Sequence, residues 1–107
     1  MSTIPAGTTE TARQHVERLL RQWREQTAHL SSSTSITQHA AYQELIALGP
    51  DALPHLFRDL ELTGDGHLSK ALRAITGADP IPTEERGQIR KIAEAWLRWA
   101  RENGHQW

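Results

Sequence analysis

The sequence predicts an all-α domain of five helices. Apolar residues recur at spacings of three and four along most of the chain, and no segment shows sustained period-two alternation. Segments rich in Gly, Pro or hydroxyl side chains separate the apolar stripes. A length of 107 residues fits one domain and leaves little room for a second. We therefore expect a flexible leader over residues 1–11 and a single helical domain over residues 12–107.

The first predicted helix covers Thr9–His29. Its apolar face is formed by residues three, four or seven positions apart: Val16, Leu19, Leu20, Trp23 and Leu30. We expect the helix to end before Ser31–Ser35, because Ser and Thr side chains compete with the backbone for helical hydrogen bonds. This hydroxyl-rich run is therefore interpreted as a loop.

The second predicted helix covers Gln38–Leu48, with Thr37 as its N-cap. Gly49 ends this helix, and Pro50 prevents its continuation. The residues expected to face inward are Tyr42, Leu45, Ile46 and Leu48.

The third predicted helix follows the N-cap Asp51 and has Pro54 in its first turn, where the missing N–H would have no helical partner. Its buried stripe is Leu53, Leu56, Phe57 and Leu60. The turn Thr63–Gly66 separates it from a short fourth helix, His67–Thr76, which Gly77 ends. The apolar residues of that fourth helix are Leu68, Leu72 and Ile75.

The fifth predicted helix follows the proline-stiffened segment Asp79–Pro82. Thr83 is its expected N-cap, and Glu84 and Glu85 in the first turn favour the positive end of the helix dipole. Its inner stripe is Ile89, Ile92, Ala93, Trp96 and Ala100, and Asn103-Gly104 ends it.

The composition excludes several classes of function. The chain has 12 Lys+Arg and 13 Asp+Glu, and its net charge of −1 indicates neither a globally basic nucleic-acid binder nor an acidic tail. It has no Cys, which excludes disulfide scaffolds and thiol nucleophiles. The longest apolar run, Leu45–Leu48, predicts neither a membrane span nor a signal peptide. We expect a soluble, cytoplasmic domain.

The sequence predicts no metal site, no cofactor and no catalytic site. The six His residues stand at 15, 29, 39, 55, 67 and 105, with no pair three or four positions apart. Thr63–Gly66 lacks the oxygen ligands and the closing Glu of a calcium loop. The run Ser31–Ser35 beside His29 and His39 lacks an orienting group and an oxyanion site. A small hydrolase around Ser31–His39 is a third hypothesis, behind two binding functions.

The turn between the second and third predicted helices resembles a HEAT repeat. In that family one helix ends at Gly and the next begins with an Ala-(Leu/Val)-Pro-x-Leu pattern, which the segment Ala47–Leu56 resembles. Leu72–Gly77 followed by Ala95–Trp99 is similar to the end of many bacterial HEAT-like proteins. The resemblance implies a HEAT-like helical hairpin over residues 38–62.

A closer resemblance, to a small uncharacterised bacterial family, covers about Trp23 to Gly104. Its motifs here are Leu30-Ser31-Ser32, His39-x-Ala41-Tyr42-Gln43, Gly49-x-x-Ala52-x-Pro54, Ala74-Ile75-Thr76-Gly77 and Ala95-Trp96-x-x-Trp99. Ala40 stands where that family usually has Pro, and Gly66–Lys70 replaces an aromatic cluster. The resemblance implies the fold and assigns no activity.

We expect a non-catalytic, protein-binding adaptor or regulator, acting in a hetero-complex or by self-association. An antitoxin-like or inhibitory subunit of a two-gene module is an analogy from size and architecture. Trp and Arg are favoured at binding hot spots, and HEAT-like units expose faces that stack on a neighbour. The expected partner-binding residues are Trp99, Arg98, Arg101, His39, Tyr42 and Gln43. The alternative is a nucleic-acid-binding accessory protein that uses the Arg-bearing faces of the first and last helices: Arg13, Arg21, Arg24 and Arg90.

Overall fold

A computed structural model describes residues 11–30, 33–82, 84 and 87–107, and it is all-α over these ranges. Its five longest helices are α1 (Ala12–Thr27), α3 (Ala40–Leu48), α4 (Leu53–Thr63), α5 (Ser69–Thr76) and α6 (Ile89–Glu102). Shorter elements connect them: α2 (Ser33–Thr37) and the 3-10 helices η2 (Gly49–Ala52) and η3 (Gly66–Leu68). The described residues contain no strand, so the predicted fold class is confirmed.

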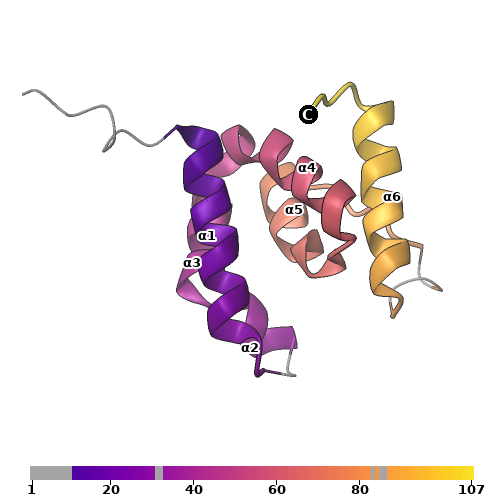
Figure 1. Cartoon of the computed structure of the whole chain (residues 1–107). Helices are drawn as coiled ribbons and strands as arrows, with labels where there is room; N and C mark the ends of the chain where they lie inside the picture. Colours follow the sequence, from indigo (N-terminus) through magenta and orange to yellow (C-terminus); the bar gives the residue numbers. More distant parts are fainter. Residues whose placement is uncertain (1–10, 31–32, 83, 85–86) are drawn as a thin grey trace, which may run out of the picture.

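The helices are arranged around α4, which packs against α6 on one side and α1 on the other (Figure 1). Helix α3 packs behind α1 and against α5. The hairpin expected over residues 38–62 is therefore not the main packing unit, because α3 and α4 make their extensive contacts with other helices. The reason is η2, which contacts α1, α3, α4 and α5 and so separates the two helices that it connects.

Helix α1 begins with a reciprocal capping box. The Thr11 hydroxyl accepts the backbone N–H of Gln14 at 3.1 Å, and the Gln14 side chain accepts the N–H of Thr11 at 3.0 Å. At the other end, the Thr27 hydroxyl donates to the carbonyl of Trp23 at 2.6 Å. The helix is thus shorter than the predicted Thr9–His29. The leader expected over residues 1–11 lies outside the described residues except for the cap Thr11.

Part of the hydroxyl-rich run is helical, contrary to its interpretation as a loop. Residues Ser33–Thr37 form α2, while Ser31 and Ser32 lie outside the described residues. The indole N–H of Trp23 donates to the carbonyl of Ile36 at 2.8 Å, which holds α2 against α1. This tertiary contact overrides the low helix propensity of Ser and Thr.

The N-cap of α3 is His39 rather than the predicted Thr37. Nδ1 of His39 accepts the backbone N–H of Ala41 at 3.1 Å, and Thr37 is buried as the last residue of α2. A His side chain thus supplies the acceptor that Ser, Thr or Asp usually provides at this position.

Helix α4 confirms its predicted apolar stripe and its stop. Leu53, Leu56, Phe57 and Leu60 are all buried. Gly64 ends the helix at φ 67°, and its N–H donates to the carbonyl of Leu60 at 2.8 Å. The start differs slightly, since Asp51 belongs to η2 and the N-cap position of α4 is Ala52.

Helix α6 starts later than predicted, after the N-cap position Gln88. The expected cap Thr83 and the acidic Glu85 lie outside the described residues, and Glu84 precedes the helix. A Cβ at Gly66 would lie 2.4 Å from the carbonyl oxygen of Ile89, so the backbone at the start of α6 sits directly on η3. The Ile89 side chain is 41% exposed, and its prediction as a core residue is wrong.

The core lies between these helices and contains most of the predicted inward residues. Its largest fully buried side chains include Trp23, Tyr42, Phe57 and Trp96. The rings of Trp23 and Tyr42 are 5.1 Å apart, which joins α1 to α3. Other predicted residues pack at the edge of this core: Ile46, Leu48 and Ile75.

Candidate functional site

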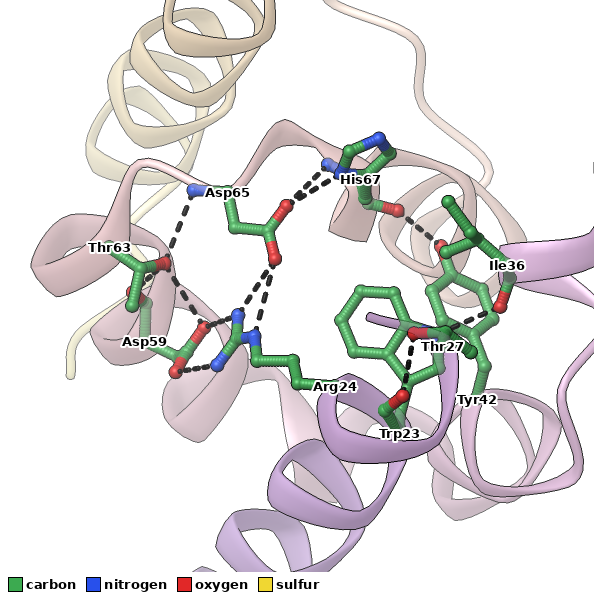
Figure 2. A network of polar contacts seen from close by, with 9 residues as sticks. All are labelled: Trp23, Arg24, Thr27, Ile36, Tyr42, Asp59, Thr63, Asp65 and His67. Atoms are coloured by element: carbon green, nitrogen blue, oxygen red, sulfur yellow. Dashed lines mark hydrogen bonds and ion pairs between the residues drawn. The ribbon is translucent and has the colours of Figure 1, made fainter. Parts of the chain in front are cut away.

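A polar network centres on Arg24, in the last turn of α1 (Figure 2). Its guanidinium donates two hydrogen bonds to Asp59 on α4, at 2.8 and 2.6 Å, and two to Asp65, at 3.3 and 3.1 Å. The pKa of Arg24 is raised, chiefly by its hydrogen bonds to Asp59, although burial lowers it. Two carboxylates thus already hold the guanidinium of Arg24, and its expected contact with nucleic acid stays a prediction.

Asp65 extends this network toward the core. Its carboxylate accepts the backbone N–H of His67 at 3.1 Å and lies 3.0 Å from Nδ1 of the same residue. The Tyr42 hydroxyl donates to the carbonyl of His67 at 2.7 Å and accepts the N–H of Ala71 at 2.8 Å. Tyr42 is 0% exposed, and burial raises its pKa. The prediction that it contacts a partner is wrong, since its side chain links α3 to α5 from the inside.

The network is a structural link rather than a pair of free carboxylates. Asp59 and Asp65 have side-chain exposures of only 17% and 20%, and both accept hydrogen bonds from Arg24. The Thr63 hydroxyl donates to the carbonyl of Asp59 at 2.9 Å and accepts the N–H of Asp65 at 3.2 Å. Donors of this chain thus occupy the carboxylate oxygens of Asp59 and Asp65 that proton transfer would need. The network instead joins α1, α4 and η3.

The other two members of the predicted patch on α3 are bonded within the chain. Nε2 of His39 lies 2.6 Å from Oε1 of Gln26 on α1. The side-chain amide of Gln43 donates to the carbonyl of Thr37 at 2.9 Å. Both side chains remain at least partly exposed, but they support the junction of α1, α2 and α3, and Tyr42 does not join them at the surface.

Trp99 and Arg101 contact the residues that follow α6, although the Arg101 side chain stays 58% exposed. The Trp99 ring stacks on His105, with centroids 5.3 Å apart and planes at 29°. Arg101 forms an ion pair with Glu61 of α4 at 2.9 Å and lies over the Trp107 ring at 5.4 Å. The expected anchors therefore contact the C-terminal segment, which also packs on Phe57 of α4.

The remaining arginines of the predicted sites lie on α1 and α6, on two sides of α4. Arg13 pairs with Glu17 along α1 at 3.2 Å, and Arg21 is exposed on the same helix. Arg90 and Arg98 are exposed on α6. Because α4 lies between α1 and α6, the two groups of arginines are on separate helices, and their contact with nucleic acid stays a prediction.

A groove of about 360 Å³ separates α1 from the outer face of α4. Helix α1 contributes the buried Leu20 and the exposed Arg21, while α4 contributes His55, Arg58 and Leu62. The Leu62 side chain is 79% exposed at the end of α4. The groove therefore combines an apolar wall, an apolar rim and cationic side chains from two helices.

His55 lines the groove, and its surroundings change its pKa. Its Nδ1 is buried and has no hydrogen-bond partner among the described residues. Burial lowers the pKa of His55, and the charges of Arg58 and Arg13 lower it further, against the opposing charge of Glu17. Burial, reinforced by these positive charges, thus favours the neutral form of the imidazole.

Sequence reasoning missed this groove, although one signal was present. Leu62 falls outside the buried stripe that runs from Leu53 to Leu60, so a helical reading places an apolar side chain on the outer face of α4. The sequence does not show which cationic side chains have partners. Arg21 and Arg24 lie on the same helix, and only the tertiary structure distinguishes the bonded one from the other.

No protein-family model, curated protein or solved structure matches this chain. The family resemblance therefore stays a prediction. Within the described ranges, no helix combines the length and apolarity that crossing a membrane requires. The same residues contain no group of three or more His, Asp or Glu side chains placed to hold a metal ion.

Proposed function

We propose that the protein is a non-catalytic adaptor or regulator that binds another protein through the outer face of α4. Leu62 carries the proposal, because a large apolar side chain stands exposed between two concave surfaces. One is the groove beside α1, and the other lies between α4 and α6, where Leu97 and Arg90 contribute to its lining. Apolar contacts flanked by Arg side chains are typical of the centre of protein–protein interfaces.

The distribution of satisfied polar groups supports this proposal. The polar network around Arg24 uses its donors and acceptors to hold three elements together, and the aromatic contacts of Trp99 and Trp107 hold the C-terminal segment. What these contacts leave open is the strip of α4 that includes Arg58 and Leu62. An antitoxin-like or inhibitory subunit acting in the cytoplasm is one form that such a regulator takes.

The test compares two exposed apolar residues that differ in their position. The full chain, its Leu62→Glu variant and its Ile89→Glu variant are immobilised and exposed to lysate of the source cells, with and without nuclease treatment. Ile89 is the matched control, because it is exposed on α6 and does not line either concave surface. We expect a protein retained by the wild type and by Ile89→Glu, with retention by Leu62→Glu weaker by about ten-fold or more.

Two results would contradict the proposed function. Recovery that disappears after nuclease treatment would show that nucleic acid makes the contact. Equal retention by all three proteins would remove Leu62 from the interface. Circular dichroism of both variants establishes that each is folded before the comparison is made.

A further inference from the structure

We propose that the groove between α1 and α4 recognises an acidic segment of the partner protein. An Asp or Glu carboxylate of that segment binds between Arg21 and Arg58, and a neighbouring apolar side chain covers Leu62. This inference rests on the proposed function and adds the chemical class of the partner.

The first support is the inventory of donors. Arg24 is bonded to Asp59 and Asp65, and Arg13 is paired with Glu17, so these guanidinium groups already have acceptors. Arg21 and Arg58 have no side-chain hydrogen bond or ion pair within the described part of the chain. They line the groove from α1 and α4 respectively. A guanidinium presents a planar fork of donors that matches a carboxylate.

The second support is the protonation state of His55. A proton on its buried Nδ1 would leave an N–H donor without an acceptor, which is a costly arrangement in a folded protein. The neutral tautomer with the proton on Nε2 leaves only an unpaired acceptor at Nδ1. In this form the Nε2–H group of His55 is a further donor on the α4 side of the groove. The groove therefore offers donors from Arg21, Arg58 and His55 to one acceptor-rich ligand.

A protein segment fits the remaining side chains better than nucleic acid does. Glu17 and Glu25 also line the groove, and their carboxylates would repel a continuous phosphate backbone. Leu62 needs an apolar side chain to cover it, which a sugar–phosphate backbone does not supply. A carboxylate followed by an apolar residue satisfies both the free guanidinium groups and this exposed leucine.

The experiment is a peptide-display selection on the immobilised full chain. It is repeated on the double variant Arg21→Glu/Arg58→Glu and on the control Lys91→Glu/Arg98→Glu, which reverses two exposed charges on α6 outside both concave surfaces. We expect the wild type and the control to enrich peptides that combine Asp or Glu with an apolar residue. The groove variant is expected to lose these peptides by at least about ten-fold and to enrich peptides rich in Lys or Arg.

Each outcome decides between the two proposals. Peptides enriched without an acidic preference, or an acidic preference that persists in the groove variant, would overturn this inference and leave the proposed function standing. Failure of the wild type to enrich any peptide above an empty surface would overturn both. A labelled single-stranded oligonucleotide that binds the wild type more tightly than the selected peptides, with a steep salt dependence, would also overturn both. If the double variant does not fold, Arg21→Glu alone provides the test, because Arg21 is exposed.

Discussion

Arg21 and Arg24 lie three residues apart on α1, yet they have opposite environments. The guanidinium of Arg24 reaches over the buried Trp23 ring and bonds to two carboxylates of other elements. Arg21 points along the outer side of the helix, where it lines a groove and has no such partner among the described residues. The same residue type on one helix can therefore serve the fold or remain available for a ligand, depending on which side of the buried stripe it occupies.

The largest expected effect is a difference in the free energy of unfolding between variants of these two arginines. Arg24→Ala leaves the partly buried Asp59 and Asp65 without their cation, and we expect it to lower the free energy of unfolding by about 2–3 kcal/mol. Arg21→Ala removes an exposed side chain and should change stability by less than about 0.5 kcal/mol. Urea denaturation measures both. Equal losses for the two variants would contradict the claim that Arg24 stabilises the fold and Arg21 does not.

A smaller effect is expected where the network reaches the core. Tyr42→Phe keeps the aromatic ring but leaves the His67 carbonyl and the Ala71 N–H without their shared partner. We expect a loss of about 1–2 kcal/mol in the free energy of unfolding. The exposed Gln43→Ala is the control and should lose less. A Tyr42→Phe variant as stable as the wild type would show that the hydroxyl does not link α3 to α5.

The smallest expected effect concerns pH and tests the burial of His55 beside the cationic groups of the groove. The pKa of His55 is lowered in the folded state, so the unfolded chain binds more protons at this residue when the pH falls below its ordinary value of 6.5. Its contribution to stability is therefore present above that pH and is lost on acidification. We expect wild-type stability to fall more steeply than that of His55→Gln between about pH 7.5 and about pH 5.5. Equal slopes, or a steeper fall for the variant, would contradict the lowered pKa of His55 in the folded state.

The local sequence predicts an element correctly where the apolar spacing and the residues at the helix ends indicate the same helix. The stripe on α4 and the stops at Gly64 and Gly77 needed only helical periodicity and glycine geometry. The helical state of Ser33–Thr37 could not be predicted this way, because a hydrogen bond from the distant Trp23 stabilises it. No local pattern indicates the close backbone approach between Gly66 and Ile89 at the start of α6 either.

The candidate site was less predictable than the fold, because function here depends on which polar groups lack partners. Sequence identifies Tyr42 as both an inward residue and a candidate contact, and only its buried hydrogen bonds decide between the two. Trp99 is covered by His105, a contact that no local pattern indicates. Conversely, Arg58 carries no distinguishing sequence motif, and its importance comes from its position on the groove opposite Arg21.

The most direct test of the groove as an acid-recognising surface is a charge exchange. An acidic peptide selected on the wild type, and the same peptide with Lys at each acidic position, are labelled and titrated by fluorescence anisotropy into the wild type and into Arg21→Glu/Arg58→Glu. We expect the wild type to bind the acidic peptide and the variant to bind the basic one. Undiminished binding of the acidic peptide by the variant, or loss of both peptides by a folded variant, would contradict this expectation.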